Sequence, residues 1–195
     1  MKNIIGLTGP TGSGKSSFAL VAANMGITVI DCDKLSREVT RRGSECLLKL
    51  SDAFGEDIIE NGELNRKLLA KRAFESEERK QQLEDIIFPF ILDSVMDKIE
   101  KAQSDTVLLD APTLYESGID EMCGTVVAVI SSFELRKKRI IERDKLTEEQ
   151  AIIRMNAGKP DSFYEERADY IINNNGTQQE FLLRCEQIIK ILTEE

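Results

Sequence analysis

The chain has 195 residues, of which 41% are hydrophobic and 31% are charged, values usual for one soluble globular domain. Its 26 basic and 35 acidic residues give a net charge of −9, which argues against a nucleic-acid partner because such binding needs clustered Lys and Arg. No apolar run is long enough to span a membrane, and the N-terminal run is too short for a signal peptide. We therefore expect a cytoplasmic protein without a membrane partner.

The histidine and cysteine content limits the kinds of catalytic and metal site that the chain can form. The chain contains no histidine, so any general base must be a carboxylate, and histidine-based catalytic triads and metal sites are excluded. The cysteines lie far apart and form no C-x-x-C pair; they are Cys32, Cys46, Cys123 and Cys185. This spacing indicates neither a zinc site nor a disulfide framework, and it favours small buried side chains in a reducing compartment.

Short apolar runs rich in β-branched residues alternate with helical patterns along the chain. The runs predict strands over residues 2–8, 27–32, 106–110, 125–130 and 169–173. Their apolar cores do not alternate with polar residues, which is typical of strands buried on both faces of a parallel sheet. The alternation of strand and helix predicts a doubly wound α/β fold with five parallel strands flanked by helices.

The segment between the second and third predicted strands is far longer than a crossover needs. It carries apolar residues at helical spacing, namely Leu64, Leu68 and Leu69, and then Leu83, Ile87, Ile91, Val95 and Ile99. Pro89 interrupts the second series and is expected to kink or break that helix. We therefore predict a helical insertion over about 35–102 that holds the acceptor substrate, with a core built from 1–34, 103–135 and 166–195.

A second segment covers about residues 136–165. The basic stretch ELRKKRIIERDK, residues 134–145, overlaps its start and has a helical pattern. Thr147 stands three residues before Gln150, the spacing of a capping box, so another helix is expected there. Gly158-Lys159-Pro160 ends that helix. The pattern predicts a mobile lid beside a phosphate site, and the alternative is a solvated surface hairpin. Asn174-Asn175-Gly176 predicts a turn, followed by an amphipathic helix through Phe181, Leu182, Ile188 and Ile191.

Gly9-Pro10-Thr11-Gly12-Ser13-Gly14-Lys15-Ser16 fits the P-loop pattern G-x-x-x-x-G-K-[ST]. Glycines let the backbone curl so that its N–H groups converge on phosphate oxygens, and the helix that follows adds its positive end. Lys15 can reach the β- and γ-phosphates of ATP, and the hydroxyl of Ser16 can bind Mg²⁺. The predicted ATP-binding residues are Thr11, Gly12, Ser13, Gly14, Lys15, Ser16 and Ser17.

Three carboxylates follow predicted strands. Asp110 ends a buried strand, the place of the second magnesium-site residue in P-loop enzymes, although acidic residues are also common strand caps. Asp31 and Asp33 flank Cys32 at the end of the second strand, where alternation along a strand predicts that both point the same way. One of them can accept the proton of an attacking hydroxyl. The alternative for Asp31 is that it only caps the next helix.

Two classes of P-loop protein compete. A regulatory GTPase needs an Asn-Lys-x-Asp sequence, and this chain contains no Asn-Lys pair; at the Asp-x-x-Gly position after the third strand, Asp110 is followed by Thr113. The sequence therefore favours a kinase for a small molecule over a nucleotide-binding switch.

Residues along nearly the whole chain resemble the dephospho-coenzyme A kinase family. The resemblance lies in LTGPTGSGKS, in the stretch from Gly26 to Asp33, in Phe54-Gly55, in Gly62 to Arg66, in Asp110 to Glu116, in Arg139, in Arg143-Asp144 and in Ala168 to Asn174. It implies an adenylate-kinase-like fold in which ATP phosphorylates the ribose 3′-hydroxyl of dephospho-coenzyme A. It also implies that Asp33 is the base, that Thr8 lies beside the acceptor or the phosphates, and that Arg139 is the lid arginine on the transferring group.

The chain departs from the family pattern at a few positions. It has Gly9-Pro10 where Gly-Gly is frequent, Phe88 where the family has a histidine, and Gly158 and Tyr164 where a glutamine and an arginine are frequent. The P-loop, Asp110 and Arg139 would look alike in a kinase for a nucleoside monophosphate or another small alcohol, which is the alternative within the class. We expect a monomer or a weak homo-oligomer.

Overall fold

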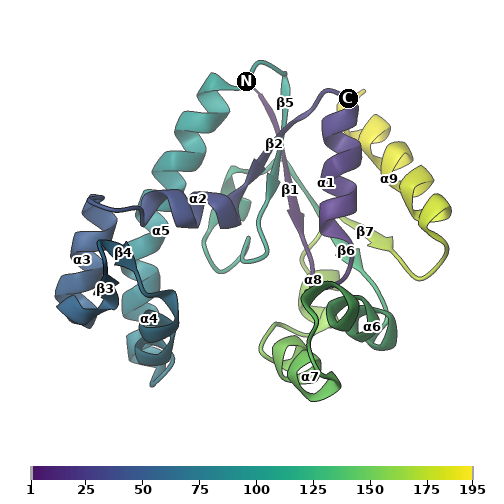
Figure 1. Cartoon of the computed structure of the whole chain (residues 1–195). Coiled ribbons are helices and arrows are strands. Elements are labelled where there is room, and N and C mark those ends of the chain that lie inside the picture. The colour runs from purple at the N-terminus through teal and green to yellow at the C-terminus, as the bar shows by residue number, and fades with distance from the viewer. Residues whose placement is uncertain (1, 195) are drawn as a thin grey trace. The chain divides into compact units, whose positions relative to one another are not determined.

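The computed structural model describes residues 2–194, and its central element is a five-stranded sheet (Figure 1). The strands in chain order are β1 (Asn3–Thr8), β2 (Thr28–Asp31), β5 (Thr106–Asp110), β6 (Thr125–Ile130) and β7 (Tyr170–Asn173). Their order across the sheet is β2-β5-β1-β6-β7, and β1 pairs in parallel with both β5 and β6, as β6 does with β7. The predicted doubly wound fold and its five strands are confirmed.

Helices cover both faces of this sheet because the strands are apolar on both sides. Val127 and Val129 of β6 belong to the core beneath α1 (Lys15–Asn24) and α9 (Gln178–Thr193), which lie side by side in Figure 1. The residues between and after them, Ala128 and Ile130, pack on the opposite face against Tyr164 of α8 (Asp161–Glu165). The sheet is therefore held between two apolar layers, as its unalternating sequence predicts.

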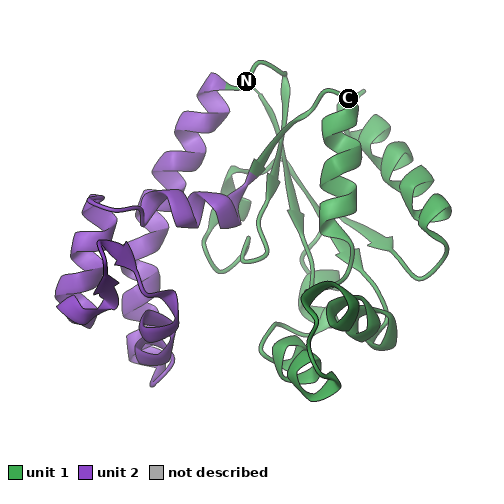
Figure 2. Ribbon diagram, in the orientation of Figure 1, with its two compact units in different colours: residues 1–30, 102–195 green, residues 31–101 purple. Residues whose placement is uncertain are grey.

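The chain divides into two compact units, residues 1–30 with 102–195, and residues 31–101 (Figure 2). The second unit contains four α-helices, one short 3-10 helix and a two-stranded hairpin. Its elements are α2 (Cys32–Val39), α3 (Glu45–Phe54), η1 (Glu56–Ile58), β3 (Ile59–Glu60), β4 (Glu63–Leu64), α4 (Arg66–Ala73) and α5 (Glu77–Lys101). Its core joins the buried side chains of Cys46, Leu50, Phe54, Ile58, Leu69 and Ala73.

Two expectations for this unit are wrong. Pro89 does not break its helix, because it lies inside α5, and the packing of α5 on α2, α3 and α4 outweighs one lost hydrogen bond. A kink at Pro89 stays a prediction. Leu64 lies in β4 rather than in a helix. Asn61 and Gly62 form the turn before it, both with positive φ, so that Ile59 pairs with Leu64 in an antiparallel hairpin.

The remaining helices of the first unit are η2 (Ile119–Met122), α6 (Phe133–Asp144) and α7 (Glu148–Asn156). Thr147 and Gln150 form the predicted capping box at the start of α7, and the predicted break at Gly158-Lys159-Pro160 separates α7 from α8. In the predicted C-terminal helix, α9, Phe181 is buried as expected, whereas Ile191 is exposed. Among the described residues, no helix is long and apolar enough to cross a membrane.

Candidate active site

The P-loop connects the end of β1 to the start of α1 in the conformation that its glycines allow. Gly9, Gly12 and Gly14 have φ values of 134°, 78° and 118°, which side chains other than glycine rarely adopt. A Cβ at Gly9 would lie 2.3 Å from the carbonyl oxygen of Val129, and one at Gly14 would lie 2.3 Å from Nδ2 of Asn174. These two positions therefore require glycine for space as well as for conformation.

The start of α1 is suited to an anion. Its N-cap residue is Gly14, and no side chain forms a capping hydrogen bond there. The described residues of the first turn, 15–18, include no acidic side chain. Such an N-terminus carries a partial positive charge with backbone N–H groups that point outward from the helix. The strand before the motif and the helix after it are the context that a P-loop requires.

Lys15 and Ser16 are the first two residues of α1. The ammonium group of Lys15 donates to the carbonyl oxygens of Gly9 at 2.8 Å and Pro10 at 3.1 Å, so the side chain lies across the loop. Ser16 is exposed. The other predicted ATP-binding residues occupy the same loop and helical turn, with Ser13 buried and Thr11, Gly12, Gly14 and Ser17 half-buried.

Asp110 lies beside the P-loop because β5 is the neighbour of β1 in the sheet. Asp110 is paired with Leu7, and the backbone N–H of Ala111 donates to the carbonyl of Leu7 at 3.1 Å. The buried hydroxyl of Thr8 lies 3.5 Å from the carbonyl oxygen of Pro112, at the limit of a hydrogen bond. The ends of β1 and β5 therefore place Thr8, Asp110 and the start of the P-loop at one edge of the sheet.

Arg139 of α6 contacts the P-loop itself. Its Nη1 lies 3.3 Å from the carbonyl oxygens of both Gly12 and Ser13, and burial lowers the pKa of the guanidinium. A Cβ at Gly12 would lie 3.0 Å from the carbonyl oxygen of Arg136, so the backbone of α6 also packs closely on the loop. The structure thus brings Arg139 together with the predicted phosphate-binding residues, and its role on the transferring group stays a prediction.

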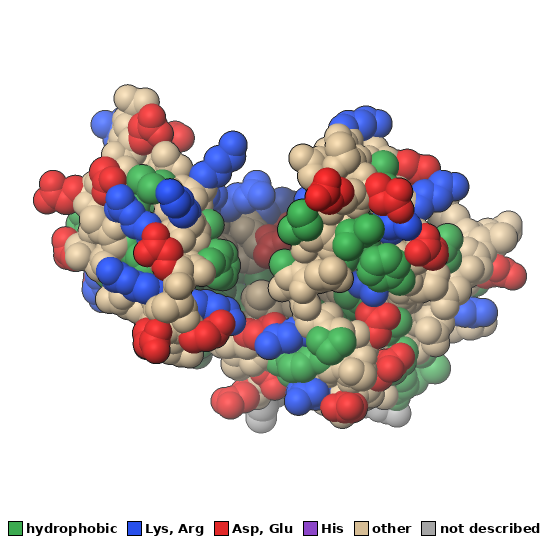
Figure 3. All heavy atoms as spheres, turned by 90° about the horizontal axis from the view of Figure 1, so that it is seen from below, with side chains coloured by type: hydrophobic (Ala, Val, Ile, Leu, Met, Phe, Trp, Pro, Cys, Tyr) green, Lys and Arg blue, Asp and Glu red, His purple; other side chains and the backbone are tan. Residues whose placement is uncertain are grey.

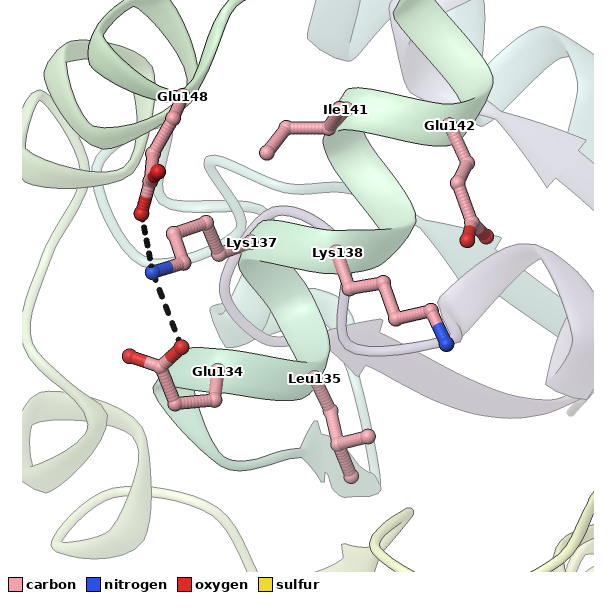
Figure 4. A pocket seen from close by; sticks show the side chains of 7 residues that line it. All are labelled: Glu134, Leu135, Lys137, Lys138, Ile141, Glu142 and Glu148. Atoms are coloured by element: carbon pink, nitrogen blue, oxygen red, sulfur yellow. Dashed lines mark hydrogen bonds and ion pairs between the residues drawn. The ribbon is translucent and has the colours of Figure 1, made fainter.

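Three other basic residues of α6, namely Arg136, Lys137 and Arg143, form ion pairs with carboxylates. Nζ of Lys137 lies 2.7 Å from Glu148 of α7 and 2.9 Å from Glu134, and both contacts are drawn in Figure 4. These three residues line a surface pocket together with Leu135, Lys138, Ile141 and Glu142. Figure 4 shows Lys138 and Glu142 directed away from Lys137 and its two carboxylates. Two further ion pairs join Arg136 to Asp161 and Arg143 to Asp144. The pairs with Glu148 and Asp161 join α6 to α7 and α8, whereas the pairs with Glu134 and Asp144 lie within α6.

Asp31 and Asp33 belong to the second unit, and their local geometry differs from the prediction. The helix α2 begins at Cys32, so Asp33 lies in its first turn and does not alternate along a strand with Asp31. The carboxylate of Asp31 caps this helix by accepting from the backbone N–H of Lys34 at 2.9 Å. Asp31 therefore caps α2, as the alternative interpretation expects, and whether it has a further role is untested. Asp33 is exposed, and its role as a base stays a prediction.

Sequence reasoning missed two polar residues that contact the P-loop network. Asn174 follows β7, and its side-chain Nδ2 donates to the carbonyl of Ser13 at 2.7 Å. Ser131 follows β6, is fully buried, and accepts from Nη1 of Arg139 at 3.1 Å. A signal was available, because polar residues that directly follow parallel strands lie at the edge of the sheet where ligands bind.

Comparison with known proteins identifies the family. The model of the dephospho-CoA kinase family matches residues 3–180. The dephospho-CoA kinase of Corynebacterium diphtheriae is 40% identical over 179 residues, 90% of each chain, and that of Geobacillus kaustophilus is 35% identical over 190 residues, 95% of this chain and 94% of the relative.

Solved structures agree with this result. A dephospho-CoA kinase from Campylobacter jejuni is 28% identical, with a TM-score of 0.71 over 100% of this chain and 98% of the other. A structure from Thermus thermophilus, also 28% identical, has a TM-score of 0.87 over 98% of both chains. A shikimate kinase from Bacteroides thetaiotaomicron, 15% identical with a TM-score of 0.56, shares the fold. The chain belongs to the dephospho-CoA kinase family.

Proposed function

We propose that the chain transfers the γ-phosphoryl group of ATP to the ribose 3′-hydroxyl of dephospho-CoA, giving CoA and ADP in the last step of CoA biosynthesis. The observation that carries this proposal is the P-loop, with its glycine-dependent backbone and the uncapped start of α1, in a chain that matches the family over residues 3–180. The alternative acceptors, nucleoside monophosphates and other small alcohols, have no specific observation in their favour.

The P-loop binds the phosphates of ATP in this proposal. Its backbone N–H groups and the start of α1 bind the β- and γ-phosphates, and Lys15 exchanges the carbonyl oxygens of Gly9 and Pro10 for phosphate oxygens. The exchange is favourable because a hydrogen bond to an ionised oxygen is shorter and stronger than one to a neutral carbonyl. Lys15 then stabilises negative charge where it develops during transfer.

The site also fits Mg²⁺, which ATP-dependent kinases use. Ser16 presents an exposed hydroxyl in the first turn of α1, and Asp110 presents a carboxylate at the neighbouring strand end. These are hard oxygen ligands of the kind that Mg²⁺ prefers, and one or two such residues suffice because phosphates and water complete its shell. Bound with ATP, the ion neutralises charge on the β- and γ-phosphates.

Asp33 and Arg139 have different roles in the transfer in this proposal. The 3′-oxygen of dephospho-CoA bonds to the γ-phosphorus as the bond to the β,γ-bridging oxygen breaks, and the hydroxyl proton passes to the carboxylate of Asp33. For a contact with the transferring group, Arg139 must exchange at least one carbonyl partner for a phosphate oxygen. Thr8, which is buried at the end of β1, lies beside the acceptor or the phosphates in this proposal.

The cytoplasm is the proposed location of this reaction. All four cysteines are free thiols, and Cys32, Cys46 and Cys185 are buried. Free cysteines are usual in the reducing cytosol, whereas disulfides are common in oxidising compartments.

ADP release in a coupled assay tests the proposed function. Purified protein is given ATP and, separately, dephospho-CoA, AMP, CMP or uridine. Of the four acceptors, we expect only dephospho-CoA to give rapid ADP release, and we expect EDTA to abolish this activity. The Lys15→Ala variant should be slower by about 10³-fold, because it loses phosphate and transition-state contacts. Faster turnover of AMP or CMP would contradict the substrate, and near wild-type turnover by Lys15→Ala would contradict the P-loop mechanism.

A further inference from the structure

The carbonyl groups on the outer side of the P-loop need hydrogen-bond donors. When successive backbone N–H groups converge on phosphate, the carbonyl groups of the same peptides point away from it. Ser13 is buried, and a buried carbonyl needs a hydrogen-bond donor. Because the N–H and the C=O of a loop share rigid peptide planes, whatever binds the outer carbonyls also sets where the inner N–H groups point.

Asn174 supplies such a donor. Its side chain is 6% exposed, and Nδ2 lies 2.7 Å from the carbonyl oxygen of Ser13. The same nitrogen lies so close to Gly14 that a Cβ there would be 2.3 Å away. Asn174 therefore fills the space next to the last peptides of the loop, immediately before the first turn of α1.

Neighbouring residues hold Asn174 in this orientation. Its backbone N–H donates to the carbonyl of Ile130 at 2.8 Å, and its backbone carbonyl accepts from the hydroxyl of Ser131 at 2.8 Å. Nη2 of Arg139 lies 3.3 Å from Oδ1, which leaves the NH₂ group of the amide facing Ser13. A flipped amide would place two donors together at Arg139 and two acceptors together at Ser13.

Arg139 contacts the same carbonyl from another element. Its Nη1 lies 3.3 Å from Ser13 O, so donors from α6 and from the residue after β7 converge on one oxygen. Arg139 has several acceptors within reach, including Gly12 and Ser131. If it turns toward a phosphate during transfer, Asn174 is the donor that still holds Ser13.

We propose that Asn174 is a positioning residue for ATP: it holds the Ser13 peptide so that the P-loop N–H groups face the phosphates. The inference rests on the proposed function, which supplies ATP as the ligand and dephospho-CoA as the second substrate. Asn174 acts through the loop and is not a catalytic residue. Loss of its donor should therefore weaken the binding of ATP much more than that of the acceptor substrate.

The test compares Asn174→Ala and Asn174→Asp with Asn173→Asp. Alanine removes the donor without adding charge, and ionised aspartate keeps the shape but can only accept. Asn173 is exposed at the end of β7, so Asn173→Asp adds the same charge one residue away from the network. We expect both Asn174 variants to raise KM for ATP at least tenfold, with KM for dephospho-CoA within twofold of wild type and a cooperative thermal transition. Asn173→Asp should leave both KM values within twofold.

Two results for the KM values of the Asn174 variants would contradict the proposal. A change below threefold in KM for ATP, or an equal rise in both KM values, would show that Asn174 is merely structural. If neither Asn174 variant folds, Ser131→Ala replaces them, because it removes the hydroxyl that supports the Asn174 backbone. It should raise KM for ATP about threefold without changing KM for dephospho-CoA, and an unchanged KM for ATP would contradict the proposal. ATP-dependent turnover by the wild type separates this outcome from failure of the proposed function.

Discussion

The two proposed active-site carboxylates, Asp33 and Asp110, stand in different local environments. Asp33 is exposed in the first turn of α2. Asp110 is half-buried at the end of β5, in register with Leu7 of the strand that leads into the P-loop. A residue that receives a proton and a residue that supports Mg²⁺ should respond differently to loss of charge.

Substituting each carboxylate by its amide separates these roles. Asp33→Asn should lower kcat by about 10²–10⁴-fold, the span of a positioned base, with the lower end expected because the hydroxyl has a very high pKa and the base acts mainly by orientation. Its KM for ATP should barely change. Asp110→Asn should instead raise the Mg²⁺ concentration needed for half activity, with part of the rate restored at high metal. The measurement is a Mg²⁺ titration at saturating ATP, and rescue of Asp33→Asn by metal would reverse the assignment.

Two cysteines allow a prediction about pH. Burial raises the pKa of the Cys46 thiol to about 11 and that of Cys185 to about 12, from the ordinary value of 9.0. Since the folded state holds these protons more tightly than the unfolded state, their contribution to stability is complete below pH 9 and falls as pH rises from 9 towards 11–12.

The rate at which the thiols are alkylated reports their burial and their raised pKa. At pH 8 both thiols should react with iodoacetamide at least about 10²-fold more slowly in the folded protein than in urea, because the thiolate is the reactive form and the access is poor. Mass spectrometry of the peptides assigns each rate to its cysteine. Equal rates in the folded and unfolded states would show that these side chains are accessible and titrate normally.

At the scale of elements, α6 combines a functional and a structural face. Arg139 extends from it to the carbonyl oxygens of the P-loop, whereas Lys137, two residues earlier, bridges Glu134 and Glu148 at the surface. Exposed ion pairs of the second kind contribute little to stability, typically about 0–1 kcal/mol. The two cations therefore offer a matched comparison within one helix.

Alanine substitutions distinguish the two faces of α6. Arg139→Ala should lower kcat by about 10²-fold or more, because the variant loses both the contact with the P-loop and the proposed contact with the transferring group. Lys137→Ala should leave kcat within about twofold, because it loses only the ion pairs with Glu134 and Glu148. Steady-state kinetics with both substrates saturating measures each value. Equal and mild effects would favour the alternative that α6 is an ordinary surface helix.

The sequence predicted elements best where one residue pattern decides the structure. Unalternating apolar runs located all five strands of the main sheet, and Thr147 with Gln150 located the start of α7. The hairpin β3–β4 was missed because each strand has only two residues, although Asn61-Gly62 is a strong hairpin signal. The break expected at Pro89 is absent because the packing that keeps α5 helical comes from other elements.

The residues of the candidate site were predictable from motifs and strand ends, whereas most contacts between distant residues were not. Residues 9–17 follow one another in the chain, so their cooperation is visible in the sequence. The contact of Asn174 with Ser13 joins residues 161 positions apart, and the one from Arg139 to Gly12 joins residues 127 positions apart. Neither appears in any local pattern, because each arises from the order of the strands in the sheet.

At the scale of the whole molecule, an acidic protein is proposed to bind anionic substrates. The net charge is −9, and on the face drawn in Figure 3 acidic and basic side chains are interspersed over the described residues. Affinity for phosphate must therefore come from local groups, namely the start of α1, Lys15 and Arg139, rather than from the overall field of the molecule. Because a charged pair is screened over about 8–10 Å at ordinary ionic strength, a strongly local site is compatible with a negative surface.

The position of the phosphate in the product tests the central claim most directly. The protein is incubated with ATP, Mg²⁺ and dephospho-CoA, and the purified product is examined by ³¹P and ¹H NMR spectroscopy. We predict one new phosphate monoester on the ribose 3′-carbon, formed in equal amount to ADP, and no such product with Lys15→Ala on the same timescale. ADP formed without a new phosphate ester, or a phosphate attached at any other position, would contradict the proposed function.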